Sequence, residues 1–454
     1  MDEGMLSLKR GRSRFGAYAK PAVMLTAMMT LAASVVIPGS IDAAGASSSS
    51  IVVAVVAPFT GADAAIGPKT ETACYAAAQE INSAGGVLGH QVSCKTVDTR
   101  GDPADAVPAV RQLYATTPNL SMVIGCTSDE ASTVVPIFAA HQTVSSCMTG
   151  ESEFDAVHYP YFFRPVPPDA AESAAMATIA KRSGYKKVAL AFGNDAGSQT
   201  FVGPALAALK KEGIKVVSNQ TLDINSTSFE TEAQAIVTAH PDAIVMETLG
   251  AAGVALINEI YQLNGNKMIP IVGTANMIDP TVFSGVTSGP VGVKNFIANF
   301  KTDNESVTFG GTAYTLYKKM VLAQSGKIKG VGNIGTLVSS SGTVHEYDMI
   351  NIAALAMTMA NSTSGSKYRA NILKIAKGGP GAVTVSTYAA GVAALKSHKT
   401  IHYVGVAGAY NFDPYQTAYG LFVQDKYLAN GTTVTFGAPL GYCNLTTCLS
   451  KVTS

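Results

Sequence analysis

Hydroxyl and carboxylate side chains come directly after two of the apolar runs in this chain. Thr127 and Ser128 lie in GCTSDEAS, after the run SMVIG, and Thr149, Gly150 and Glu151 lie in MTGES, after the run TVSSC. Hydroxyl groups and backbone N–H groups at the start of a helix can bind a desolvated carboxylate. Ser128 could instead be an ordinary N-cap, and the two roles are compatible. The first candidate chemistry is therefore the binding of a small acid.

Two further carboxylates stand at the ends of apolar runs farther along the chain. Asp195 lies in FGNDAGS, and Glu247 ends the run AIVME. An unpaired carboxylate is costly to bury, so a buried Glu247 would need a cationic or hydrogen-bonding partner. That partner could be a ligand, or it could be a basic side chain of a neighbouring helix. Both residues are therefore candidates for contact with a solute.

The sequence lacks the common patterns of catalysis and cofactor binding. It has no G-x-S-x-G, no G-x-x-x-x-G-K-[ST], and no G-x-G-x-x-G after the first apolar run, where Pro58 and Phe59 stand instead. His398 and His402 lie where a loop enters a predicted strand, so their spacing does not bring them together. We therefore expect a protein that is not an enzyme and that has no cofactor and no metal site.

The cysteines form the next group with a definite chemistry. The predicted disulfides are Cys74–Cys94, Cys126–Cys147 and Cys443–Cys448. The first pair would join a helix to the strand on which it packs. The second would join the ends of adjacent parallel strands, about 5 Å apart, and the third would close a small loop. Each cysteine could instead be free, and the pair at the strand ends is the weakest case.

The N-terminus has the pattern of a secretory signal. A basic run from Lys9 to Lys20 precedes PAVMLTAMMTLAASVVIPGS, and the small residues AGASSSS follow. We predict a signal peptide over residues 1–46 and a mature chain that begins near Ser47. A retained membrane anchor is the alternative, but the apolar run is short for a span of roughly 20 residues. No cysteine stands directly after this run to carry a lipid. We expect export to the cell envelope or the extracellular space, where disulfides form.

Length and charge restrict the class of protein further. After the signal, roughly 400 residues remain, which is too many for one ordinary core and indicates two domains. The net charge is +1 and 14% of the residues are charged. A nucleic acid or another polyanion requires a clustered basic surface, so we expect no such partner.

The elements that would position these residues alternate between strand and helix. IVVAVVAPF is apolar throughout, as expected of a strand buried on both faces, and TETACYAAAQEINSA places its apolar residues on one helical stripe. The proline-rich segment 161–170 interrupts the alternation, which then restarts. Helices are expected over 132–141 and 346–360, and a hairpin near residue 420. We predict an α/β fold with two doubly wound parallel-sheet lobes, in which ligands bind beyond the carboxyl ends of the strands.

Several motifs in order resemble a known family. PFTG follows the first strand, and EINSAGGVLGHQV, DTRGDPADAVPAV, a glycine loop with Ser128, FGNDAGS and an FDP turn come later. Over about residues 51–430, the chain resembles the extracellular solute receptors of branched-chain amino-acid ABC importers. The resemblance implies the type I periplasmic-binding fold, in which two lobes are joined by three crossovers. The expected lobes are lobe 1, over 47–165 and 300–404, and lobe 2, over 166–299 and 405–454.

The resemblance also implies a solute held between the lobes. Two tyrosines and an ammonium-binding acid of the family correspond to Ala196, Leu249 and the pair Ala275-Asn276, so these three anchors are missing. Tyr347, expected to open a helix, matches a family tyrosine that reaches the cleft. The predicted ligand-binding residues are Thr127, Ser128, Thr149, Gly150, Glu151, Asp195, Leu249, Asn276 and Tyr347.

Together with these observations, the resemblance implies an exported, monomeric receptor for a small polar solute, either amino-acid-like or a small carboxylate or amide. It would deliver the solute to the membrane permease of an ABC importer. A sensor or scavenger without a permease is one alternative, and an enzyme on the same fold is another. Without an acid in the second lobe, leucine, isoleucine and valine should bind weakly or not at all. If Glu247 or Asp195 turns inward, the pairing is restored.

Overall fold

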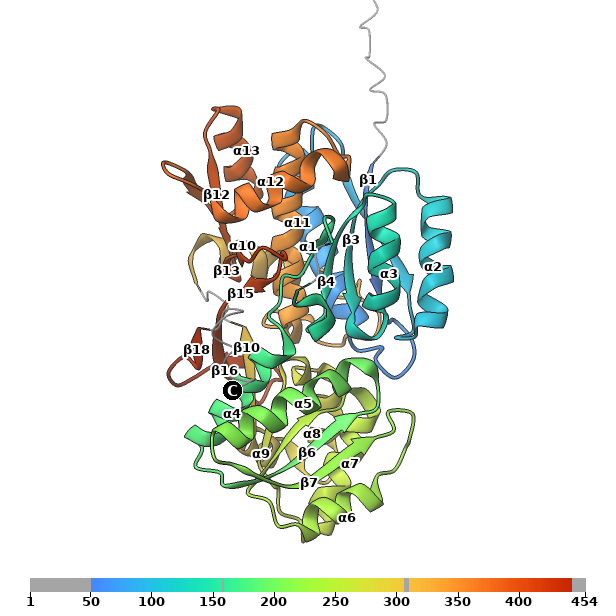
Figure 1. Ribbon diagram of the computed structural model, residues 1–454, viewed down its shortest axis with the longest axis vertical. Helices are drawn as coiled ribbons and strands as arrows, with labels where there is room; N and C mark the ends of the chain where they lie inside the picture. Colours follow the sequence, from blue (N-terminus) through green and yellow to red (C-terminus); the bar gives the residue numbers. More distant parts are fainter. Residues whose placement is uncertain (1–49, 157–158, 306–309, 443–454) are drawn as a thin grey trace, which may run out of the picture. The chain divides into compact units, whose positions relative to one another are not determined.

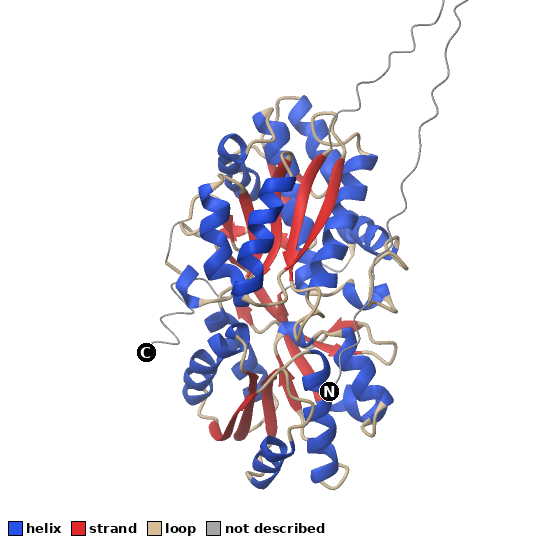
Figure 2. Cartoon of the chain, turned by 90° about the vertical axis from the view of Figure 1, so that its right-hand side faces the viewer, coloured by secondary structure: helices blue, strands red, loops and turns tan. Residues whose placement is uncertain are grey.

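The computed structural model describes residues 50–156, 159–305 and 310–442. This part of the chain forms two lobes, each built around its own sheet. In Figure 1 strands β1, β3 and β4 lie in the upper lobe, and β6 and β7 lie in the lower lobe. Figure 2 shows helices packed on both faces of the strands. The predicted α/β fold with two doubly wound sheets is confirmed.

The sheet of the first lobe is parallel, with the strand order β2-β1-β3-β4-β5. Its strands are β1 (Ile51–Ala57), β2 (Val92–Asp98), β3 (Leu120–Thr127), β4 (Val144–Met148) and β5 (Phe162–Phe163). The helices of this lobe are α1 (Gly67–Ser83), α2 (Pro103–Thr116), α3 (Ser128–Ala140), α10 (Gly311–Leu322), α11 (Ser341–Ala360), α12 (Gly365–Lys377) and α13 (Tyr388–Lys396). Every residue of β1 is buried, as its unbroken apolar sequence predicts.

The sheet of the second lobe has the order β17-β16-β10-β9-β8-β6-β7, and β18 pairs with β16. Its strands are β6 (Lys187–Gly193), β7 (Lys215–Leu222), β8 (Ala243–Glu247), β9 (Ile271–Gly273), β10 (Phe300–Glu305), β16 (Leu421–Tyr427), β17 (Thr433–Thr435) and β18 (Gly441–Tyr442). The helices are α4 (Asp169–Arg182), α5 (Ala196–Lys211), α6 (Glu230–Thr238), α7 (Gly250–Leu263), α8 (Pro280–Ser288) and α9 (Gly292–Asn299). The segment from β10 to β6 is parallel, and β16 joins it antiparallel.

Two smaller sheets complete the fold. Strands β11 (Val383–Val385), β12 (Ile401–Gly405) and β13 (Gly408–Ala409) form one, and β14 (Asn411–Phe412) and β15 (Ala418–Tyr419) form the other. The predicted hairpin near residue 420 is therefore two antiparallel pairs, β14 with β15 and β16 with β17. The second of these pairs belongs to the large sheet of the second lobe.

The predicted boundaries between the lobes need two corrections. The expected boundary at residue 300 is wrong, because β10 pairs with β9 and β16 in the second sheet, and the chain returns to the first lobe only after Glu305. The expected boundary at residue 405 is also too early. Val406, Tyr410 and Ala418 pack in the same hydrophobic core as β1 and α11. The chain therefore crosses near residue 166, after Glu305 and near Gly420.

Two disulfides join neighbouring elements of the first lobe, both as predicted. Cys74 on α1 pairs with Cys94 on β2, with a Cα–Cα distance of 6.0 Å. Cys126 on β3 pairs with Cys147 on β4, with a Cα–Cα distance of 4.6 Å. The predicted pair Cys443–Cys448 and the predicted signal peptide lie outside the described residues. The helices of the described part of the chain are too short or too polar to cross a membrane.

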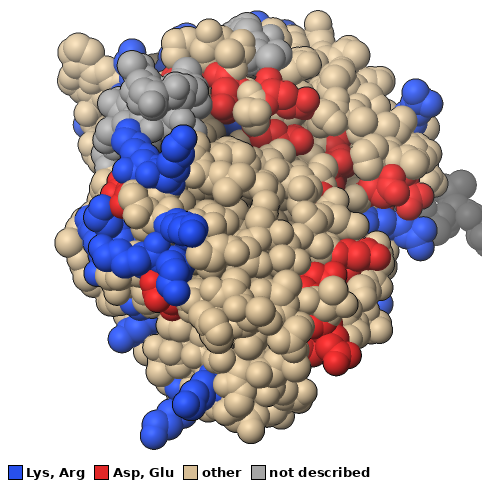
Figure 3. All heavy atoms as spheres, turned by 60° about the horizontal axis from the view of Figure 1, so that its bottom comes forward, with Lys and Arg blue, Asp and Glu red and all other residues tan. Residues whose placement is uncertain are grey.

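The surface of the second lobe reflects the low share of charged residues in the sequence. Figure 3 shows lysine and arginine side chains along one side of this view and acidic side chains along the other. A broad area without charged side chains lies between them.

Candidate functional site

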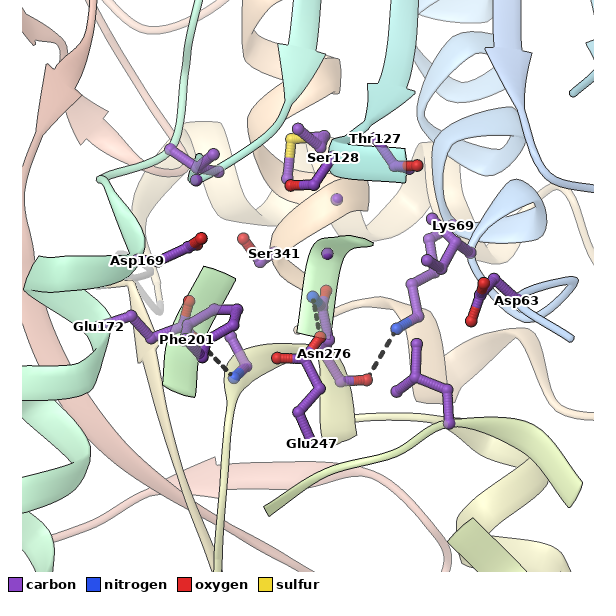
Figure 4. Close-up of a pocket in the computed structure, with 18 of the residues that line it drawn as sticks. Asp63, Lys69, Thr127, Ser128, Asp169, Glu172, Phe201, Glu247, Asn276 and Ser341 are labelled. Atoms are coloured by element: carbon purple, nitrogen blue, oxygen red, sulfur yellow. Dashed lines mark hydrogen bonds between the residues drawn. The ribbon is translucent and has the colours of Figure 1, made fainter. Parts of the chain in front are cut away.

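A cavity lies between the two lobes, beyond the carboxyl ends of strands from both sheets (Figure 4). The loops after β1, β3 and β4 form its first wall, and the loops after β6, β8 and β9 form its second. About 780 Å³ inside it is free of protein atoms, part of it open to solvent. Cavities at the carboxyl ends of parallel strands are typical sites for small molecules.

The first wall begins at the N-terminus of α3. This helix begins at Ser128 rather than at residue 132, and Thr127 is its N-cap. The Thr127 hydroxyl donates to the Glu130 carboxylate over 2.7 Å, so the N-cap role considered for Ser128 falls on Thr127. Thr127 and Ser128 both line the cavity, and Ser128 Oγ lies 3.1 Å from Thr149 Oγ1. The Ser128 hydroxyl is therefore available at a helix start, where it could contact an anionic group.

Of the three residues predicted after β4, Gly150 reaches the cavity, and its neighbours lie behind the wall. Thr149 is fully buried, and its hydroxyl donates to Glu151 Oε2 over 3.2 Å. Burial raises the pKa of Glu151 to about 8, and the nearby Glu153 adds to the effect. Thr149 and Glu151 thus support the wall rather than form its surface.

The second wall brings together Asp195, Leu249, Asn276 and also Glu247. Glu247 is 4% exposed, and its Oε1 accepts a hydrogen bond from Asn276 Nδ2 over 3.2 Å. Its Oε2 has no hydrogen-bond partner among the residues that the structure describes. The partner of Glu247 is therefore an amide, and not the basic helix side chain that the sequence left open.

Hydrogen bonds join the two walls across the cavity. The Lys69 ammonium of α1 donates to the Asn276 carbonyl oxygen over 3.0 Å, and the Gly197 N–H of α5 donates to Asp129 Oδ1 over 3.0 Å. Burial lowers the pKa of the Lys69 ammonium, although the nearby Asp279 opposes this shift. These contacts exist only when the lobes are close together, so the structure represents a closed arrangement of the lobes.

The cavity wall is strongly acidic. The carboxyl side chains that line it are Asp63, Asp129, Asp169, Glu172, Asp195, Glu247 and Glu305, and the lining contains a single lysine, Lys69. Burial raises the pKa of Asp63 and that of Glu247 to about 8, and repulsion from other carboxylates adds to both shifts. Burial also raises the pKa of Asp129 to about 6 and that of Asp169 to about 7. Several of these groups are therefore partly protonated near neutral pH.

Sequence reasoning missed most of this acidic wall. The loops PFTGADAAIG and GCTSDEAS are recognisable as strand-end loops, but their acids Asp63 and Asp129 were not weighed as site residues. Asp169 and Glu172 stand on α4, directly after the first crossover, and the sequence gives no sign that this turn faces the cavity. Among the described residues, no group of three or more His, Cys, Asp or Glu side chains is arranged to hold a metal ion.

The predicted role of Tyr347 at the cleft is not supported, because α11 begins at Ser341 rather than at residue 346. Tyr347 lies farther along the helix, 2% exposed in the core of the first lobe, and its hydroxyl donates to the Glu80 carboxylate. Ser341 and Gly342, at the true start of the helix, line the cavity instead.

Weak binding of leucine was predicted only for the case in which no acid of the second lobe reaches an ammonium group, because Ala275 and Asn276 stand where the family has an acid. Asp195 and Glu247 line the same cavity and can take that role. The alternative in which one of them restores the pairing is the one that the structure supports.

Two lobes that enclose a polar cavity at the carboxyl ends of two parallel sheets define a two-lobed solute-binding fold. The sequence matches the family described as periplasmic binding protein over residues 50–307, and the chain belongs to this family. A Leu/Ile/Val-binding protein homolog of Brucella melitensis is 26% identical over 245 residues, which are 53% of this chain and 66% of the relative. The match thus spans slightly less than two thirds of that relative's length. The predicted family is confirmed.

Solved structures share the fold at low sequence identity. A leucine-binding protein LivK of Thermotoga maritima superposes with a TM-score of 0.67 at 16% identity, covering 86% of this chain and 98% of that one. A solute-binding protein of R. palustris in complex with benzoate superposes with a TM-score of 0.67 at 16% identity, and the match covers 87% of this chain and 97% of that one. LivJ of Streptococcus pneumoniae in complex with isoleucine superposes with a TM-score of 0.66 at 17% identity, and the match covers 86% of this chain and 100% of that one. These likenesses establish the fold of the chain.

Proposed function

We propose that this protein is an exported receptor that captures a small polar solute between its lobes and delivers it to the membrane permease of an ABC importer. The observation that carries the proposal is that one cavity takes polar side chains from both lobes, and that hydrogen bonds join its walls. A solute in this cavity contacts both lobes at once. It therefore favours the closed arrangement over an open one.

The proposed mechanism is a shift between two arrangements of the lobes. Three crossovers connect the lobes, and the first contains Pro165, Pro167 and Pro168, which restrict the backbone on one side of the cavity. Without solute the lobes open by rotation about these crossovers. Solute contacts with both walls then stabilise the closed form, as in other hinge proteins.

The walls offer different groups to a solute. In the first lobe, the Ser128 hydroxyl and the Gly150 backbone stand near the start of α3 and suit an anionic or carbonyl group. In the second lobe, Glu247 and Asp195 suit a cationic group. An amino acid has both kinds of group, and the relative in Brucella melitensis is named a homolog of Leu/Ile/Val-binding proteins. An amino-acid-like solute is the starting point for a search.

A thermal-shift screen of the purified protein tests the proposal. A solute at 100 times its dissociation constant should add about 2.7 kcal/mol to the free energy of unfolding. Small-angle X-ray scattering on the same samples should show a smaller radius of gyration with the solute than without it. A panel of amino acids, amides and small carboxylates that gives no thermal shift and no change in radius would contradict the receptor function.

Uptake measurements separate the importer receptor from the alternatives. Cells that lack this protein should lose high-affinity uptake of the identified solute and regain it when the gene is restored. Binding without any change in uptake would favour a sensor or scavenger. Conversion of the bound solute by the purified protein would favour an enzyme on the same fold.

A further inference from the structure

The acidic wall of the cavity has little positive charge of its own. Of the seven carboxyl side chains in the lining, Glu305 alone has a basic partner within 4.0 Å among the described residues, namely His345. Lys69 is the single cation in the lining, and its ammonium donates to the Asn276 carbonyl oxygen rather than to a carboxylate. The wall therefore contains more acidic groups than the protein itself pairs.

Three of these acids use only part of their hydrogen-bonding capacity within the protein. Asp129 accepts from the Gly197 N–H, Asp195 from the Ser198 N–H over 2.7 Å, and Glu172 from the Ala275 N–H over 2.7 Å. Each of these bonds uses one carboxyl oxygen and comes from a neutral donor. A carboxylate has room for several more donors.

Glu247 gives an independent indication that a donor is expected from a ligand. Its side chain is almost completely buried, and Figure 4 shows its carboxyl group beside Asn276, directed into the cavity. Oε1 accepts a hydrogen bond from Asn276, and the Thr274 hydroxyl lies near enough to the carboxyl group to lower its pKa, but Oε2 has no donor with hydrogen-bond geometry in the described part of the chain. A buried carboxyl oxygen without a donor is costly, and a cationic N–H group of a bound solute would remove that cost.

We propose that the solute of this cavity carries a net positive charge, as a diamine or an amino acid with a basic side chain does. This inference rests on the proposed receptor function. One cationic group would bind at Glu247 and Asp195 on the second wall, and the other at Asp63 and Asp129 on the first. A solute with a cation at each end links the acidic groups of the two lobes, and the same contacts hold the lobes closed.

A basic amino acid and a diamine of the same length differ in one group, the carboxylate. Lysine and cadaverine have the same spacing between their amino groups, but lysine also has a carboxylate. If the carboxylate binds at Ser128 and Gly150, lysine should bind more tightly than cadaverine. If these residues contact no anion, cadaverine should bind at least as tightly, because it places no negative charge on an acidic wall.

Calorimetry on the full protein tests the inference with four probes: lysine, cadaverine, norleucine and benzoate. Norleucine has a chain of similar length to that of lysine but no cationic end. Lysine or cadaverine should bind at least about tenfold more tightly than norleucine and benzoate. If norleucine or benzoate binds as tightly as both cations, the inference is overturned and the receptor function stands. If none of the four binds and the wider solute screen is also negative, the receptor function itself fails.

A pair of matched variants assigns the cation to the proposed place. Glu247→Gln removes the charge and keeps the shape, and it should weaken binding of the preferred cation on the order of tenfold or more. Glu230→Gln makes the same chemical change at an exposed position at the start of α6, outside the lining, and should leave the affinity unchanged. Circular dichroism and the melting temperature report whether each variant folds. Equal affinities of two folded variants for the cation would overturn the assignment to Glu247.

Discussion

Gly150 stands at a place where the two lobes lie in close contact. A Cβ atom on this residue would lie 1.7 Å from Asp169 Oδ1, 2.5 Å from Asp169 Cγ and 3.0 Å from the Asp169 nitrogen. Asp169 begins α4 in the second lobe, is 5% exposed, and its N–H donates to the Gly150 carbonyl oxygen over 2.9 Å. The substitution Gly150→Ala should therefore force Asp169 away from the first lobe.

The expected magnitude follows from the size of this overlap. Inserting a methyl group into a closely packed contact costs about 1–3 kcal/mol when side chains and backbone must shift. The contact joins the two lobes, so the closed form should bear this cost, whereas an open form should not. An affinity that depends on closure should then fall by roughly 5- to 150-fold.

The assay compares Gly150→Ala with Gly203→Ala, using the solute with the largest thermal shift in the screen. Gly203 lies on α5, and a Cβ there would meet no atom within 4 Å, so this control adds the same methyl group without a clash. Calorimetry should show weaker binding for Gly150→Ala alone. Scattering should show a larger radius of gyration for Gly150→Ala at equal solute concentration. If both variants match the unmodified protein in both measurements, the reasoning about closure is refuted.

Three further predictions concern the site and the first lobe. Ser128→Ala should weaken solute binding by about 1–2 kcal/mol, the value of a hydrogen bond to a charged group, and an unchanged dissociation constant in a folded variant would exclude Ser128 from the site. Intact-mass measurement after alkylation should find no free thiol at Cys74 or Cys94, and labelling of both cysteines in the unreduced protein would contradict the disulfide. Denaturant titration should show that Cys94→Ser lowers the free energy of unfolding by roughly 3 kcal/mol. The affinity for a cation should rise from pH 6 to pH 8 and level off above, because Asp63 and Glu247, each with a pKa of about 8, must lose protons when a cation binds. Calorimetry in buffers of different ionisation enthalpy should then show proton release at pH 7, and a flat pH profile without release would contradict the role of these acids.

Structural features that depend on the local sequence alone were predicted correctly. The unbroken apolar run of β1 indicates a strand covered on both faces, and the structure buries all of it. The spacing of Cys74 and Cys94 places them on a helix and on the strand beneath it, where they form a disulfide. Gly85 and Gly86 after α1 have φ values of +99° and +74°, a conformation that glycine adopts without strain.

The predicted starts of two helices were less accurate, and this error affected the predicted site residues. The sequence placed the start of α3 at residue 132 and that of α11 at residue 346, whereas the helices begin at Ser128 and Ser341. The first turn of a helix has little apolar periodicity, because its residues face the loop and the ligand side rather than the core. Tyr347 was assigned to the cleft because it matches a family position and was expected to open the helix, whereas it lies in the core of the first lobe.

The sequence by itself determined the fold class, the two lobes and the family, because these depend on periodic apolar patterns and on short motifs that lie close together in the chain. Tertiary structure alone decided the membership of β10 in the second sheet, since a strand acquires its sheet from partners such as β16, which is far away in the sequence. It also decided the character of the cavity. Asp63, Asp129, Asp169 and Glu247 come from separate loops and helices, and each alone is an ordinary polar residue. Closure of the lobes buries them together, and this shared burial gives the cavity its acidic wall and raises the pKa values of these groups.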